Sequence, residues 1–177
     1  MYGAPVRLTS LSSNRLVMNP VLERQRVRES LQRASVAIFV TLDHHGAPNG
    51  RPMLPLWLPD DPNIFFLTHQ DSRKVAEIAE RPQVVLAIIS AHSYFVVLGS
   101  ASALRDLALI RRLWRPSYRA WFPAGKDDRE ATAVRVVVNR VNYWEPPRSQ
   151  IVRVFQAVRA FVTRSAVETP MKTIDSL

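Results

Sequence analysis

Six short segments rich in β-branched and aromatic residues follow one another along the chain, and this succession most limits how the chain can fold. Turn-forming residues separate several of them, as in the heptapeptide HHGAPNG at residues 44–50, and such turns are typical of hairpins. The segments predict strands over residues 36–43, 51–58, 63–68, 84–90, 93–102 and 133–144. The short connections between the first three predict a meander, in which each strand pairs with the next.

Helical signals occur at only a few places between these strands. They predict helices near residues 19–34, 71–80, 103–114 and 149–162. A doubly wound parallel sheet needs a helix between nearly every pair of strands, so this order favours an antiparallel, barrel-like α+β domain. The predicted organisation is a flexible N-terminal arm (1–18), a barrel domain (19–146), and a C-terminal helix and tail of the same domain (147–177).

The charge of the chain and its lack of cysteine exclude several functions. The 177 residues contain no cysteine, which excludes disulfide scaffolds and thiolate metal sites. The net charge is +9, but the basic residues are scattered and form no run interleaved with aromatics, so neither a nucleic-acid nor a membrane partner is expected. No apolar run reaches about 20 residues and no signal-peptide pattern is visible, so a cytoplasmic protein is expected. The histidines show no metal-ligand spacing, and no metal site is predicted.

The segment FFLTHQDSRK at residues 65–74 is the strongest candidate for a binding site from residue chemistry alone. A helix is expected to begin near Ser72, where free backbone N–H groups and the helix dipole favour an anion. Arg73 adds a planar fork for phosphate oxygens, and Lys74 adds a point charge. In a meander, Arg51 would reach the same anion from the neighbouring strand. The alternative is a capped helix whose arginine and lysine lie on the surface.

Five landmarks between about residues 21 and 146 resemble a known family. They read TLDHHGAPNGRPM, FFLTHQDSRKVAEIAERPQV, YFVVLGSASALRD, LWRPSYRAWFPAG and RVNYWEPP. In this order and spacing they resemble the pyridoxamine 5′-phosphate oxidase-like FMN-binding split-barrel superfamily, most closely its general stress protein 26 type. The resemblance implies a six-stranded antiparallel split β-barrel with peripheral helices. It also implies a homodimer that holds FMN in a cleft at the subunit interface.

The same resemblance assigns cofactor contacts to five stretches of this chain, and its Ser-Arg-Lys stretch is implied to take the 5′-phosphate. His69 joins them because it lies at the strand end, where it could touch the polar edge of the flavin. The candidate cofactor-binding residues are Arg51, Pro52, Met53, Leu54, Leu67, Thr68, His69, Ser72, Arg73, Lys74, Trp114, Trp121, Phe122 and Trp144. For the aromatic residues between 114 and 122, Tyr118 among them, the alternative is a plain core or dimer-interface role.

The implied function is that of an FMN-binding flavoprotein, and the sequence leaves alternatives open. It could be an oxidoreductase that transfers electrons between a nicotinamide and an acceptor, or a non-catalytic stress protein that binds FMN or FAD. The same fold could use deazaflavin F420 or haem, although the Ser-Arg-Lys grip favours FMN over haem. Pyridoxamine 5′-phosphate oxidation is disfavoured, because the chain lacks the C-terminal Arg-Leu-His-Asp type segment of the true oxidases. No residue stands out as a catalytic acid or base.

Overall fold

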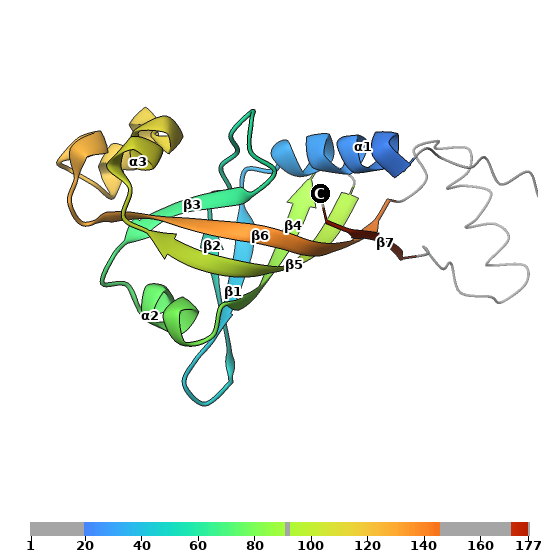
Figure 1. Cartoon of the computed structure of the whole chain (residues 1–177), viewed down its shortest axis with the longest axis horizontal. Coiled ribbons are helices and arrows are strands. Elements are labelled where there is room, and N and C mark those ends of the chain that lie inside the picture. The colour runs from blue at the N-terminus through green and yellow to red at the C-terminus, as the bar shows by residue number, and fades with distance from the viewer. Residues whose placement is uncertain (1–19, 91–92, 146–170, 177) are drawn as a thin grey trace, which may run out of the picture.

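The computed structural model describes residues 20–90, 93–145 and 171–176. Within these ranges three α-helices and two short 3-10 helices surround one antiparallel sheet of seven strands (Figure 1). The helices are α1 (Pro20–Gln32), α2 (Arg73–Glu80), α3 (Leu107–Leu113), η1 (Pro116–Ala120) and η2 (Gly125–Asp127). The strands are β1 (Ala37–Leu42), β2 (Pro48–Met53), β3 (Ile64–His69), β4 (Gln83–Ser90), β5 (Ser93–Leu104), β6 (Ala131–Trp144) and β7 (Lys172–Asp175).

The strand order is β2-β1-β4-β5-β6-β3, and β7 pairs with β6 beyond the part that β3 occupies. The predicted α+β class and the six antiparallel strands are therefore confirmed, and β7 adds a short seventh strand to the sheet. The sheet curls without closing, because its two end strands, β2 and β3, do not pair with each other. The predicted arm at residues 1–18 and helix at residues 149–162 lie outside the described residues.

The predicted meander is wrong in its second half. β1 and β2 form a hairpin, but β3 pairs with β6 at the opposite end of the sheet order. Proline lacks the N–H group that a ladder needs, and Pro52 and Pro55 stand where β2 would have to pair further. A single bridge follows instead, in which Leu56 and Phe65 exchange backbone hydrogen bonds of 2.8 and 2.9 Å.

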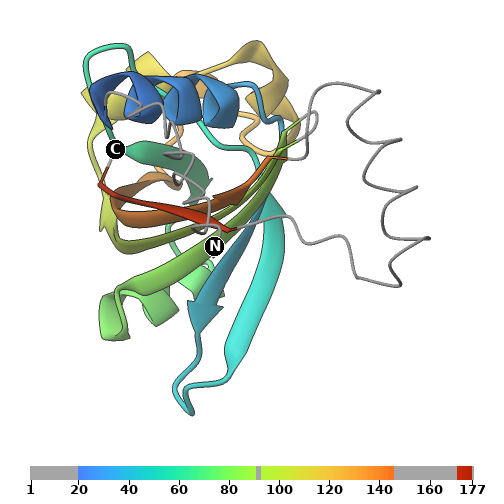
Figure 2. The same cartoon turned by 90° about the vertical axis from the view of Figure 1, so that its right-hand side faces the viewer.

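The β1–β2 turn is also tighter than predicted, so β2 begins at Pro48 rather than at Arg51. The Asp43 carboxylate accepts hydrogen bonds from the backbone N–H groups of His45 and Ala47, both at 2.9 Å. Gly46 supplies the positive φ of 83° that the turn requires. Figure 2 shows the resulting hairpin reaching beyond the rest of the sheet.

Two hydrophobic cores lie against different parts of the sheet. The first fills the curled sheet beneath α1 and includes Val27 and Leu31 from that helix together with Phe39. The second lies under α3 and η1 and includes Phe65 and Phe122. β3 contributes to both cores, since alternate residues of a strand point to opposite faces, which explains why five of its six residues are buried.

The outer face of the sheet is unusually apolar. Ile38, Ile89, Tyr94 and Val137 are between 44% and 69% exposed, although strand positions that face water are usually polar. The register places Ile89 opposite Tyr94 and Ile38 opposite Ala87, so these side chains share one face. None of the described helices is long and apolar enough to cross a membrane.

Candidate functional site

A pocket of about 270 Å³ lies where the ends of β2 and β3 meet the start of α2 and the turn η1. The two strands approach each other there because the sheet curls and the Leu56–Phe65 bridge ties the segment after β2 to β3. The pocket is lined by Arg51, Pro52, Met53, Leu54, Leu67, Thr68, His69, Lys74, Tyr118, Trp121 and Phe122. Arg51, Thr68 and Lys74 lie at the α2 end, the polar end, whereas His69 lies with the aromatic residues at the η1 end, the aromatic end.

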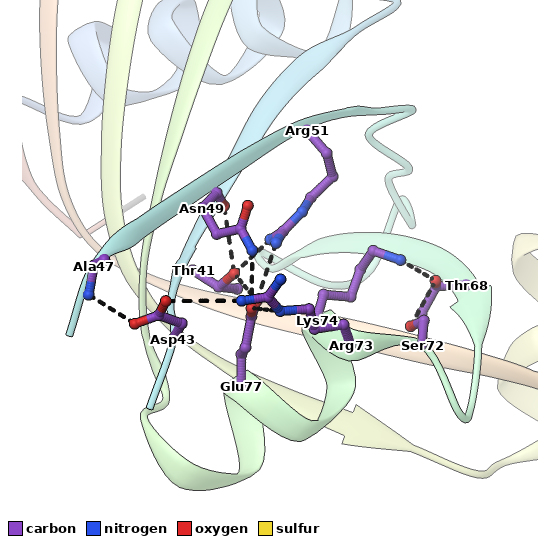
Figure 3. A network of polar contacts seen from close by, with 10 residues as sticks. All are labelled: Thr41, Asp43, Ala47, Asn49, Arg51, Thr68, Ser72, Arg73, Lys74 and Glu77. Carbon is purple, nitrogen blue, oxygen red and sulfur yellow. Dashed lines mark hydrogen bonds and ion pairs between the residues drawn. The ribbon is translucent and has the colours of Figure 1, made fainter. Parts of the chain in front are cut away.

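Lys74 is a cation at the polar end of the pocket, and its hydrogen-bond partner is a neutral hydroxyl. Its Nζ donates a hydrogen bond of 2.9 Å to Oγ1 of Thr68 (Figure 3), a residue that is 7% exposed. Burial lowers the pKa of Lys74, and the nearby charge of Arg51 lowers it further, while Glu77 opposes both effects. Among the described residues Lys74 makes no ion pair, so its charge is not neutralised by a direct contact.

Arg51 and Glu77 form a buried ion pair behind this lysine. Nη2 of Arg51 lies 3.0 Å from Oε2 of Glu77, and the two side chains are 20% and 5% exposed. Burial alone would raise the pKa of Glu77, but hydrogen bonds from Thr41, Asn49 and Arg51 outweigh it, so this pKa is lowered. Glu77 is therefore a charged group at neutral pH, held by donors from β1 and β2.

Arg73 does not line the pocket. Its Nε lies 3.0 Å from Oε1 of Glu77 and its Nη2 lies 3.7 Å from Asp43, and the side chain is 67% exposed. Ser72 precedes α2 without capping it through its side chain, and its Oγ lies 3.3 Å from Oγ1 of Thr68. Of the Ser-Arg-Lys stretch, only Lys74 therefore lines the pocket.

The aromatic end is built from the turn that follows α3. Phe122 is 2% exposed and stacks on the His69 ring, with centroids 4.6 Å apart and an interplanar angle of 29°. Trp121 is 55% exposed, and its carbonyl oxygen lies 3.1 Å from Nε2 of His69. Tyr118 is buried, and burial raises the pKa of its phenol, which Arg115 partly opposes.

Two of the predicted tryptophans lie outside the pocket. Trp114 packs behind the lining residues, with its ring 6.0 Å from that of Tyr118 and 6.2 Å from that of Phe122. Trp144 lies opposite Tyr94 near the other end of β6. Thr68 of β3 lines the pocket and pairs with Thr132 of β6. Trp144 lies twelve residues after Thr132 on β6, which strand geometry converts to about 40 Å along that strand.

Most of the residues that line the pocket were predicted from the sequence, and one of them, Tyr118, was not. Ser72, Arg73, Trp114 and Trp144 do not line the pocket, and Tyr118 does. Glu77 was also missed. Its place four residues after Arg73 allows an ion pair on a helix, but its burial under β1 and β2 depends on the tertiary fold. The described residues contain no group of three or more His, Asp or Glu side chains that could hold a metal ion.

The curled antiparallel sheet with a pocket between its unpaired end strands defines a split-barrel protein. The family described as "Pyridoxamine 5′-phosphate oxidase like" matches residues 23–168, and the chain belongs to this family. None of the curated proteins compared with the chain matches it significantly.

Solved structures with similar folds carry related descriptions. A putative general stress protein 26 from Jannaschia sp. CCS1 gives a TM-score of 0.69 at 14% identity, covering 88% of this chain and 99% of that one. The general stress FMN/FAD binding protein from Xanthomonas citri gives 0.62 at 23% identity, with coverages of 71% and 90%. A pyridoxamine 5′-phosphate oxidase-related, FMN binding protein from Nostoc punctiforme PCC 73102 gives 0.57 at 12% identity, with coverages of 88% and 93%. At these identities the likeness establishes the fold.

Proposed function

We propose that the chain is an FMN-binding flavoprotein whose cofactor occupies the pocket, with the phosphate at the Lys74 end and the ring at the aromatic end. The observation that carries this proposal is the chemical division of one pocket between a cationic and an aromatic end. FMN has the matching division, since a phosphate ends the chain that leaves its flat ring. Small-molecule sites commonly combine an apolar lining with a few placed polar groups.

The residues of the polar end fit a phosphate monoester. Lys74 has a neutral partner, the Thr68 hydroxyl at 2.9 Å, so its charge is free to meet an anion. An anion beside it would offset the burial that lowers its pKa. Arg51 lines the same end with its guanidinium held in place, and charge-assisted hydrogen bonds from such groups are strong.

The residues of the aromatic end fit a flat ring. Trp121 offers an exposed indole, while Phe122 and Tyr118 are buried behind it in the second core. The proteins from Xanthomonas citri and Nostoc punctiforme are described as FMN/FAD binding and FMN binding, which supports a flavin over haem. FAD and deazaflavin F420 remain alternatives, because both carry phosphate on the chain that leaves the ring.

A bound flavin would supply hydride and single-electron chemistry, while the protein would hold and orient it. We propose an oxidoreductase that takes electrons from a reduced nicotinamide. A protein that only binds flavin is the alternative, since none of the described residues that line the pocket stands out as a catalytic acid or base.

We further propose a homodimer with the pocket at its interface. The pocket, at about 270 Å³, is smaller than the roughly 300–1,000 Å³ that is common for ligand sites. Bound FMN would therefore protrude from the pocket of one subunit. Pro52 lines the pocket and lies opposite Ile38, which belongs to the exposed apolar face. The apolar face therefore begins at the mouth of the pocket. Covering this face with a second copy would also bring a Trp144 toward a pocket that it cannot reach within its own subunit.

Absorbance titration with FMN tests the proposed function. The wild-type protein should bind FMN with a shifted flavin spectrum, and Lys74→Gln should weaken binding about a hundredfold, the range for losing a hydrogen bond to a charged group. Lys126→Gln, at an exposed lysine of η2, is the matched control and should bind as wild type does. Failure of the wild type to bind FMN would contradict the proposal. Oxidation of reduced nicotinamide by the loaded protein would separate an enzyme from a binder.

A further inference from the structure

Glu77 is a buried carboxylate that lies beside the pocket without lining it. It belongs to α2, is 5% exposed, and faces the hairpin formed by β1 and β2 (Figure 3). It accepts hydrogen bonds from Nη2 of Arg51 and from Nδ2 of Asn49, both at 3.0 Å, and one from the Thr41 hydroxyl. A buried charge of this kind is costly unless it is fully paired, so its position beside the cationic end of the pocket requires an explanation.

The guanidinium of Arg51 is held at two of its nitrogens. Nη2 donates to Glu77 and Nη1 donates to the Thr41 hydroxyl, which in turn donates to Glu77. An arginine that is free in solvent loses rotamer freedom when a ligand fixes it. Arg51 has already lost that freedom within the protein, so a ligand meets a guanidinium that is fixed in advance.

Two consecutive cations of α2, Arg73 and Lys74, have different partners, and Glu77 is the partner of the first. Arg73 lies 3.0 Å from Glu77 and outside the pocket, whereas Lys74 reaches into the pocket and donates to Thr68. Because Glu77 follows Arg73 by one helical turn, the i,i+4 pair holds Arg73 on the side of α2 that faces Asp43. Glu77 therefore pairs with the cation that lies outside the pocket, while Lys74, about 100° further round the helix, reaches into it.

We propose that Glu77 is a positioning residue that holds the Arg51 guanidinium at the phosphate end of the pocket. The inference rests on the proposed flavin site, because it assigns Glu77 the role of fixing Arg51 before the phosphate binds. The hydrogen bonds that lower the pKa of Glu77 keep it charged at neutral pH, as this role requires. Thr41 acts in the same network without carrying a charge.

The test measures the affinities of FMN and riboflavin for wild type, Glu77→Gln and Thr41→Val. Riboflavin lacks the phosphate, so a change in positioning should weaken FMN about tenfold in Glu77→Gln and severalfold in Thr41→Val, while riboflavin affinity stays unchanged. Thr41→Val removes one hydroxyl and no charge, which separates positioning from a change in electrostatic potential. Glu80→Gln is the matched control, because Glu80 lies on the same helix, is 52% exposed and, within the part of the chain that the structure describes, forms an ion pair only with Arg81.

A double-mutant cycle shows whether the effect passes through Arg51. In an Arg51→Gln background, Glu77→Gln and Thr41→Val should change FMN affinity no further, because the group that they position is gone. If Glu77→Gln does not fold, as checked by circular dichroism, Thr41→Val and its cycle decide the result. The proposal is overturned if FMN binds more tightly to Glu77→Gln, if riboflavin affinity falls equally, or if the loss persists without Arg51. A wild type that binds neither ligand would instead overturn the flavin site itself, and the positioning role with it.

Discussion

The two ends of the pocket are held in place by different interactions. At the aromatic end, Phe122 and Tyr118 belong to a hydrophobic core beneath α3, and only Trp121 is largely exposed. At the polar end, a single buried carboxylate, Glu77, gathers donors from two strands and from its own helix. The first arrangement depends mainly on packing, whereas the second depends on charge and is therefore more sensitive to salt. Changes at the two ends should therefore affect different properties of the protein.

The largest effect should follow from removing Phe122. Its ring is 2% exposed in the second core, so Phe122→Ala should lower the free energy of unfolding by about 3–5 kcal/mol through lost burial and a cavity. Urea unfolding followed by circular dichroism measures this loss. A loss below about 1 kcal/mol would show that packing does not hold the aromatic end.

Trp121 should separate binding from stability at the same end. Because its indole is 55% exposed, Trp121→Ala should leave the unfolding midpoint nearly unchanged. It should weaken FMN and riboflavin by the same factor, about tenfold, since both ligands share the ring and stacking contributes about 1–1.5 kcal/mol. A loss confined to FMN would place the phosphate, rather than the ring, beside Trp121.

A loss of FMN affinity at alkaline pH should come from the polar end. Burial lowers the pKa of Lys74 from its ordinary value of 10.5, and only the protonated form attracts phosphate. FMN affinity should therefore fall severalfold as the pH rises through this lowered pKa, earlier than for an ordinary lysine. Riboflavin serves as the control, because it shares the ring ionisation of FMN and lacks the phosphate. An FMN-specific alkaline loss that persists in Lys74→Gln would assign the titration to another group.

The smallest effect is expected for Arg73. Its side chain is 67% exposed and pairs with Glu77 and Asp43, so Arg73→Gln should change FMN affinity by less than about threefold, the range of exposed ion pairs. Isothermal titration at two salt concentrations measures this change. A loss as large as that of Lys74→Gln would mean that Arg73 turns toward the pocket when the ligand binds.

Local sequence patterns predicted the strands and the two cations that line the pocket, Arg51 and Lys74, whereas most of the other lining residues came from the family resemblance. Segments rich in β-branched and aromatic residues located the six main strands, and the helix start after a strand end located Lys74. The resemblance added residues such as Thr68 and Trp121. Arg51 does line the same pocket as Lys74, but for a reason other than the predicted meander. The curl of the sheet brings the ends of β2 and β3 together without pairing them.

The remaining features depend on contacts between distant segments, which local patterns do not encode. Which of Arg73 and Lys74 faces the pocket depends on how α2 is oriented against the sheet, where Glu77 contacts β1 and β2. Tyr118 belongs to an aromatic cluster that sequence alone could equally assign to the core, and it both belongs to the second core and lines the pocket. The strand β7 follows from pairing with the far part of β6 and has no strong pattern of its own.

The most direct test of a pocket with a phosphate end and a ring end is the ratio of riboflavin to FMN dissociation constants. We expect wild type to bind FMN about a thousandfold more tightly than riboflavin, because only FMN engages both Lys74 and Arg51. Lys74→Gln should lower this ratio about a hundredfold, to the part that Arg51 supplies. Trp121→Ala should leave the ratio at the wild-type value while both ligands bind more weakly. A wild-type ratio near one, or the same fall in both variants, would contradict the division of the pocket into two ends.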